Sequence, residues 1–89
     1  MGSKKTRIDL QNIKSDKVMD TRGLESPMPL LKTINALSCL GPEKIVEVWC
    51  TDPDSKIDIP QIDRKECQYM GHVNDPDGYT RFFIQKVMI

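Results

Sequence analysis

Apolar residues recur at helical spacing in one stretch of the chain and gather in short strand-like runs elsewhere. Leu30, Leu31, Ile34 and Leu37 lie three or four residues apart, which predicts a helix over residues 27–40 with this stripe facing the core. A Gly-Pro pair follows residue 40 and ends the helix. A second helix is predicted to begin at Asp58 and to run to Tyr69 or Met70, where a glycine closes it.

Four runs have the composition of β-strands. The clearest covers residues 43–51, which are rich in β-branched and aromatic side chains, and a short candidate covers residues 17–20. Two further strands are expected over residues 72–74 and 79–87, joined by a turn with the sequence Asp-Pro-Asp-Gly. Trp49 belongs to the clearest strand, and its neighbours Val48 and Cys50 must face the opposite side of the sheet. Which set faces the helices stays open.

The predicted order is strand, helix, strand, helix, strand, strand. It favours an α+β two-layer sandwich in which two helices cover one face of a four-stranded mixed sheet. The chain of 89 residues is long enough for one such domain, which we assign to residues 17–89. Residues 1–16 are mostly polar and are interpreted as an N-terminal arm, although they could also dock as an extra strand.

Charge and composition narrow the function classes. Thirteen basic and thirteen acidic side chains give a formal net charge of zero, which argues against direct nucleic-acid binding. No apolar run follows the basic residues near the start of the chain, so we expect neither a secretory signal nor a membrane span and place the protein in the cytoplasm.

The three cysteines are expected to be free thiols. Cys39, Cys50 and Cys67 are odd in number and no pair has Cys-x-x-Cys spacing, so with His72 as the one histidine no metal site is predicted. Cys39 is expected at the surface and Cys50 in the core, whereas Cys67, near the end of the second predicted helix, could be either. His72 is interpreted as a packed or hydrogen-bonded residue.

Ser26 and Pro27 have the pattern of a helix start. Serine suits the N-cap and proline suits the first helical position, where a missing N–H costs nothing. Residue 26 is therefore expected at the positive end of a helix dipole, where an anion is favoured and a cysteine would become more acidic. On its own, Ser26 is an ordinary helix cap. No Gly-x-Ser-x-Gly elbow surrounds it, which argues against a hydrolase nucleophile.

With these elements in place, the chain resembles the TusA/SirA-like family of small sulfur-carrier proteins over residues 17–87. The resemblance is carried by five short motifs in family order: Arg22-Gly23-Leu24, Pro27 and Pro29 of a Cys-Pro-x-Pro signature, Asp52-Pro53, Asp58-Ile59-Pro60 and Gly71-His72. It implies a fold like that of the C-terminal domain of translation initiation factor three. Because that domain contacts RNA, RNA contact is a third functional possibility, which the neutral charge disfavours.

The resemblance also implies a mechanism. The signature cysteine of the family accepts sulfane sulfur, holds it as a persulfide and relays it to an acceptor protein, with destinations that include tRNA thiolation. The expected partners are a sulfur donor protein, such as a cysteine desulfurase or a rhodanese, and a downstream acceptor. No cofactor is expected, and the protein is interpreted as a carrier or sulfurtransferase component rather than a turnover enzyme.

The chain departs from the family pattern at the reacting atom, because Ser26 occupies the cysteine position and a hydroxyl cannot carry a persulfide. One interpretation is that serine was engineered in place of a native cysteine; it is favoured because the surrounding residues all suit the family. The alternative is a binding or regulatory module on the same fold that naturally lacks sulfur chemistry.

The resemblance assigns further roles around position 26. Arg22 could hold an anionic sulfur species or a partner carboxylate near the helix start, although an exposed turn residue is its plainer interpretation. Site-shaping roles fall to Arg22, Gly23, Glu25, Pro27 and Pro29. Candidates for partner contact are Met28, Lys32, Asp52 and Asp58. For the two aspartates the plainer interpretation is favoured, with Asp58 as a helix cap and Asp52 as a loop acid.

Overall fold

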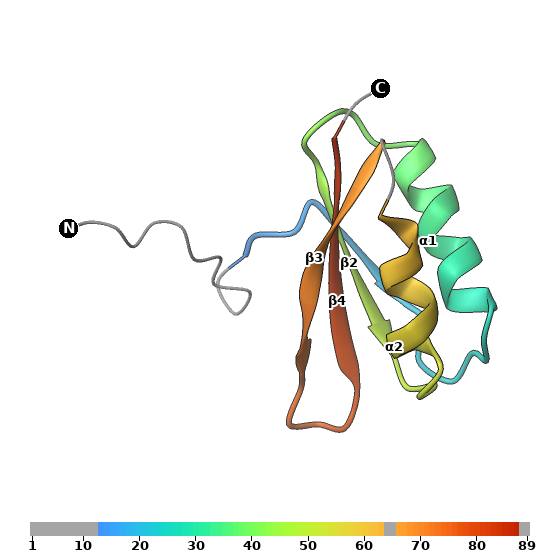
Figure 1. Ribbon diagram of the computed structural model, residues 1–89. Coiled ribbons are helices and arrows are strands. Elements are labelled where there is room, and N and C mark those ends of the chain that lie inside the picture. Colours follow the sequence, from blue (N-terminus) through green and yellow to red (C-terminus); the bar gives the residue numbers. More distant parts are fainter. Residues whose placement is uncertain (1–12, 64–65, 88–89) are drawn as a thin grey trace.

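The computed structural model describes residues 13–63 and 66–87, and it forms two layers. One layer is a four-stranded sheet, and the other consists of helices that cover one face of that sheet (Figure 1). In chain order the elements are β1 (Lys17–Asp20), α1 (Met28–Ser38), β2 (Ile45–Cys50), α2 (Ser55–Asp58), the 3-10 helix η3 (Ile59–Ile62), β3 (Cys67–Asn74) and β4 (Thr80–Lys86). The predicted α+β sandwich with a mixed sheet is confirmed.

The sheet has the strand order β1-β2-β4-β3. Strand β1 pairs with β2 in parallel, because the chain crosses over through α1 between them, and Asp20 lies beside Trp49. Strands β3 and β4 form an antiparallel hairpin whose turn holds a 3.0 Å bond from the Gly78 N–H to the Asp75 carbonyl. Both β1 and β2 end at the same edge of the sheet, so the loops that follow them are neighbours.

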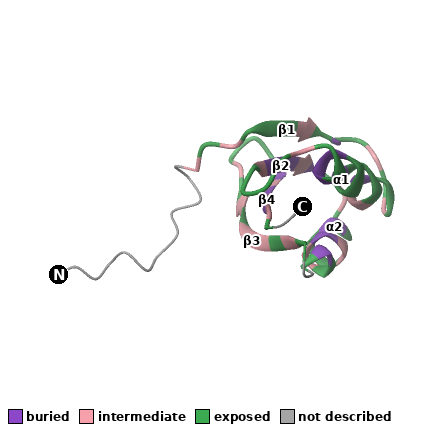
Figure 2. Ribbon diagram, turned by 90° about the horizontal axis from the view of Figure 1, so that it is seen from above, coloured by how far each residue is buried: buried purple, intermediate pink, exposed green. Residues whose placement is uncertain are grey.

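The core lies between the sheet and the helices, as the burial pattern shows (Figure 2). Alternate residues of β2 face it, which settles the orientation that the sequence left open. Val46, Val48 and Cys50 are at most 1% exposed and pack in the core, whereas Trp49 lies on the other face of the sheet. The remaining buried apolar members of the cluster come from α1, η3 and β4: Ala36, Leu37, Ile59, Ile62, Phe82 and Ile84.

The predicted apolar stripe of α1 is partly wrong. Leu37 is buried and Leu30 packs against the core, but Leu31 and Ile34 are exposed. The buried side of the helix is formed by Pro29, Thr33, Ala36 and Leu37. Thr33 can be buried because its hydroxyl donates a 2.7 Å hydrogen bond to the carbonyl of Pro29 inside the same helix.

The predicted bounds of the second helix are also wrong. Instead of running from Asp58 to Tyr69 or Met70, the helical segment begins at Ser55 and ends at Ile62. Ile59 and Ile62 are both buried, and a spacing of three residues matches the three residues per turn of the 3-10 helix that contains them. Beyond it, Cys67 belongs to β3 rather than to a helix.

Gly71 does not end a helix either. It lies inside β3 with a φ of 133°, where the register shifts between Tyr69 and Gly71. A glycine suits this irregularity, because a side chain would rarely adopt that backbone conformation. His72 follows, and its ring packs against Phe82 and bonds the Tyr69 hydroxyl at 3.1 Å, as its interpretation as a packed or hydrogen-bonded residue predicts.

The cysteine predictions are confirmed where they were definite. Cys39 is exposed and Cys50 is buried, and burial raises the pKa of the Cys50 thiol above its usual value. Cys67 is half-buried.

Residues 1–12 of the predicted arm lie outside the described residues. At its end, Ser15 donates a hydrogen bond to Glu47, and the Asp16 N–H donates a 2.8 Å bond to the carbonyl of Ile45. The end of the arm is therefore joined to β2.

Candidate functional site

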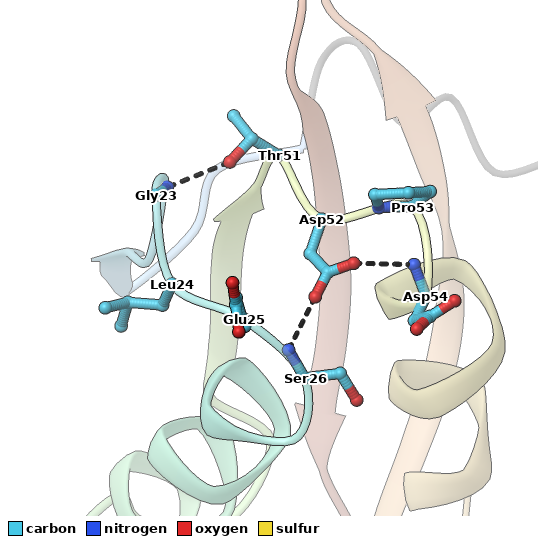
Figure 3. A pocket seen from close by; sticks show the side chains of 8 residues that line it. All are labelled: Gly23, Leu24, Glu25, Ser26, Thr51, Asp52, Pro53 and Asp54. Carbon is cyan, nitrogen blue, oxygen red and sulfur yellow. Dashed lines mark hydrogen bonds between the residues drawn. The ribbon is translucent and has the colours of Figure 1, made fainter.

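Two neighbouring loops form an open hollow beside the start of α1. One connects β1 to α1 and the other connects β2 to α2, and together they enclose about 430 Å³. The residues that line the hollow are Gly23, Leu24, Glu25, Ser26, Thr51, Asp52, Pro53 and Asp54 (Figure 3). The position that the family motif singled out therefore lies in a hollow built by two segments about 26 residues apart in sequence.

The first loop is fastened to the end of β2 by hydrogen bonds. The Thr21 hydroxyl and N–H both donate to the carbonyl of Trp49, at 2.6 and 2.9 Å. The Gly23 N–H donates a 2.8 Å bond to the Thr51 hydroxyl (Figure 3). Gly23 has a φ of 86°, a conformation that favours glycine, which explains why a glycine stands at this turn.

Asp52 ties the two loops together. One of its carboxylate oxygens accepts a 2.5 Å bond from the Ser26 N–H, and the other accepts a 3.0 Å bond from the Asp54 N–H (Figure 3). These backbone bonds, first from Asp54 and then from Ser26, hold the pKa of the Asp52 carboxyl below its usual range. The ionised carboxylate of Asp52 therefore fixes the backbone of residue 26.

The side chain of Ser26 points toward helix α2. Its hydroxyl donates a hydrogen bond to the carboxylate of Asp58, the last residue of that helix. Both residues are half-buried, and Asp58 is not among the residues that line the hollow. Residue 26 is thus held twice, through its N–H by Asp52 and through its side chain by Asp58.

The predicted N-cap role of Ser26 is wrong. Helix α1 begins at Met28, its N-cap is Pro27, and no side chain caps it. The helix thus begins one residue later than predicted, and Pro27 is its N-cap instead of its first helical residue. Ser26 lies just outside the helix, and its peptide bond to Pro27 is cis. The Ser26 hydroxyl binds Asp58 from another element instead of a free N–H of its own helix. Residue 26 still lies next to the positive end of an eleven-residue helix.

Arg22 lies on the face of the sheet that the helices leave open. Its guanidinium donates to both carboxylate oxygens of Asp20 at 2.9 and 2.8 Å. It also stacks on two aromatic rings, 5.0 Å from the centre of Trp49 and 4.9 Å from that of Tyr79. The hydrogen bond to Asp20 raises the pKa of Arg22 further. With its charge engaged there, Arg22 is not among the residues that line the hollow around Ser26.

The other predicted site residues divide between the hollow and its surroundings. Gly23, Glu25 and Asp52 line it. Met28 is 43% exposed at the first position of α1, and Pro29 is buried in the first turn of the same helix. Lys32 lines a separate hollow with Lys17 along α1.

Sequence reasoning missed four of the lining residues. Leu24 was not proposed as a site residue, although its neighbours Gly23 and Glu25 were. Thr51, Pro53 and Asp54 were not proposed either, although they directly follow the strand beside β1. Parallel pairing of the first two strands would have indicated that their following loops meet, and the predicted element order already contained this signal.

Neither a metal centre nor a membrane span is found in the part of the chain that the structure describes. Among residues 13–63 and 66–87, no group of three or more histidine, cysteine or acidic side chains is arranged to hold a metal ion. Within the same ranges, no helix has the length and apolar character needed to cross a membrane.

The protein is a small two-layer α+β domain in which half-buried Ser26 lies next to the start of α1. Two aspartates, Asp52 and Asp58, hold this residue in place. A family model described as sulfurtransferase TusA matches residues 17–86. The chain belongs to this TusA family, as the sequence motifs indicated.

Relatives with assigned names support this family membership. The chain is 35% identical over 74 residues to "Putative sulfur carrier protein YrkI" of Bacillus subtilis, a match that covers 83% of this chain and 99% of that protein. It is 35% identical over 57 residues to sulfur carrier protein TusA of Pseudomonas aeruginosa, covering 64% of this chain and 67% of that protein. A protein of Aquifex aeolicus named "Putative sulfur carrier protein" is 27% identical across 86% of this chain, which spans only 39% of that protein's length.

Proposed function

We propose that the protein is a sulfur carrier whose reactive position is residue 26. The proposal is supported by family membership, by the names of the relatives and by one structural observation above all. Residue 26 lines an open hollow and is held by two carboxylates: its N–H donates a hydrogen bond to Asp52, and its side chain donates one to Asp58. A reactive atom needs such fixed geometry to meet the sulfur of another protein.

In the proposed transfer, a cysteine thiolate at position 26 attacks the terminal sulfur of a persulfide on a donor protein. A new sulfur–sulfur bond forms at position 26 as the donor's sulfur–sulfur bond breaks, and the donor leaves as a thiolate. Relay to an acceptor repeats the exchange in the other direction. No net oxidant is needed, because the sulfane sulfur moves at its own oxidation level.

Serine at position 26 cannot perform this step, since an oxygen atom does not form the persulfide. We propose that serine stands in place of a native cysteine, because the neighbouring Leu24, Glu25, Pro27 and Pro29 all suit the family pattern. The competing proposal is a natural binding or regulatory module without sulfur chemistry. The residue encoded at position 26 in the genomic reading frame separates the two.

The proposed partners are a donor such as a cysteine desulfurase or a rhodanese, and a downstream acceptor, with tRNA thiolation among the candidate destinations. Both would meet the protein at the hollow, in the cytoplasm. Met28 is exposed beside the hollow and its flexible side chain suits a changing set of partners. Asp52 and Asp58 already bind residue 26, so a partner would reach them at the edges of the hollow.

The direct test measures sulfur loading by intact mass. This chain, Ser26→Cys and Asn35→Cys are each incubated with a cysteine desulfurase and free cysteine. We expect a reducible gain of one sulfur atom in Ser26→Cys alone. Asn35→Cys is the matched control, because Asn35 is an exposed position of α1 away from the hollow and gives the same number of thiols.

Cys39 is a control within every sample, because it is an exposed thiol near the other end of α1. Equal loading of Cys39 or of the Asn35→Cys thiol would show that any accessible sulfur suffices and would contradict the proposed site. Absence of loading in folded Ser26→Cys would favour the binding module.

A further inference from the structure

Asp58 differs from the other acidic residues near the site because it contacts the side chain of Ser26. Its carboxylate accepts the hydrogen bond of the Ser26 side chain, whereas Asp52 binds the Ser26 N–H and Asp54 lines the hollow. The atom of residue 26 that would react in a carrier therefore lies against one carboxylate, which comes from a helix 32 residues away in sequence.

The charges around this contact are mostly negative. Glu25, Asp52 and Asp54 line the hollow, and Asp58 accepts the hydrogen bond of the Ser26 side chain. Among residues 13–63 and 66–87, the nearby cations lie elsewhere. Arg22 is stacked on the open sheet face, Lys32 lines another hollow, and Lys56 is an exposed residue of α2. The start of α1 opposes these carboxylates with about half a positive charge, less than the full negative charge of Asp58.

We infer that Asp58 is a positioning residue that fixes the side chain of residue 26 and keeps a thiol at this position protonated while the protein is free. The inference rests on the proposed function, which requires that thiol. A hydroxyl or a thiol can donate a hydrogen bond to Asp58, but a thiolate has no proton to donate and would repel the carboxylate. The helix start alone would have the opposite effect, because it favours the thiolate.

The test measures the alkylation rate of each cysteine against pH in Ser26→Cys, with iodoacetamide as the probe and peptide mass spectrometry to assign the site. Adding Asp58→Asn removes the charge and keeps the shape. We expect the inflection of the thiol at position 26 to fall by about one pH unit. Alkylation at pH 7 should become about fivefold faster, since the thiolate is the reacting form.

Two control variants distinguish the effect of the Asp58 charge from a general loosening of the site. Asp54→Asn removes a carboxylate from the same hollow without touching the Ser26 side chain and should lower the inflection by much less. Asp58→Glu keeps the charge and should keep the high inflection. An unchanged inflection in Asp58→Asn, or an equal fall in Asp54→Asn, would overturn the inference.

A second measurement does not depend on the folding of Asp58→Asn. In Ser26→Cys by itself, the inflection of the new thiol should lie above that of Cys39 in the same molecules, and a lower value would also overturn the inference. Failure of the proposed function is a separate result: no sulfur would load onto Ser26→Cys, yet the alkylation profile would still respond to Asp58→Asn.

Discussion

At the scale of single residues, Glu47 shows how a charge is kept inside this small protein. It is 6% exposed on the sheet face opposite the helices. Burial by itself would raise its pKa, but hydrogen bonds from Trp49, Ser15 and Arg81 outweigh that effect and hold the pKa of Glu47 below its usual value. Its ionised form is therefore the one that the fold stabilises.

This predicts an acid-dependent loss of stability. A carboxyl with a lowered pKa in the folded state contributes stability above the unfolded value, near pH 4.5, and loses it as the pH falls toward the folded value. Glu47→Gln should lower the free energy of unfolding by about 1–3 kcal/mol at pH 7 and by less below about pH 4. Urea denaturation at several pH values measures it, with exposed Glu43→Gln as the control. An equal loss at pH 3 and pH 7 would refute this explanation.

Residue-level chemistry was partly predictable from the sequence. The motifs identified Ser26, Asp52 and Asp58 as site candidates, but not that the last two bind the first. The N-cap expectation for Ser26 followed a local rule, and it failed because the helix begins at Met28 with Pro27 at the N-cap, so Ser26 lies outside the capping position.

At the scale of elements, α1 has a buried side that differs from its apparent apolar stripe. Leu37 is 2% exposed and Leu31 is 49% exposed, although both were expected in the core. The helix is rotated so that the short side chains of Thr33 and Ala36 face the sheet. Apolar spacing could not reveal this, because a threonine that bonds its own helix counts as polar in the pattern while it is buried in the fold.

The two leucines give a matched comparison. Leu37→Ala should lower the free energy of unfolding by about 2–4 kcal/mol because it leaves a cavity in the core. Leu31→Ala should change it by less than about 1 kcal/mol, since its side chain is already half in water. Chemical denaturation of both variants provides the measurement, and similar losses would show that the helix is rotated differently from the structure.

The end of the second helical segment is a boundary that the sequence did not predict. Residues 66–70 have the pattern of a helix end, yet β3 begins at Cys67 because antiparallel pairing with β4 satisfies its backbone. Pairing between strands is a tertiary effect, so local propensity did not reveal it. The order of the elements along the chain and both ends of β1 were predictable, since they depend on short runs bounded by clear turns.

At the scale of the whole molecule, the sheet order brings the site together. Parallel β1 and β2 carry their following loops to one edge, and the start of α1 lies beside the same hollow. The fold class and the family could be predicted from the sequence, because several weak motifs occurred in the right order. We propose that this chain keeps the docking surface of a carrier and lacks the sulfur atom that would make it active.

Competition for a donor tests this claim most directly. The loading rate of Ser26→Cys by a cysteine desulfurase is followed by intact mass while the serine-containing chain is added in increasing excess. We predict that loading slows as the serine chain occupies the donor, and that an equal excess of serum albumin has no effect. Unchanged loading at tenfold excess of the serine chain would show that it does not dock, and would contradict the claim.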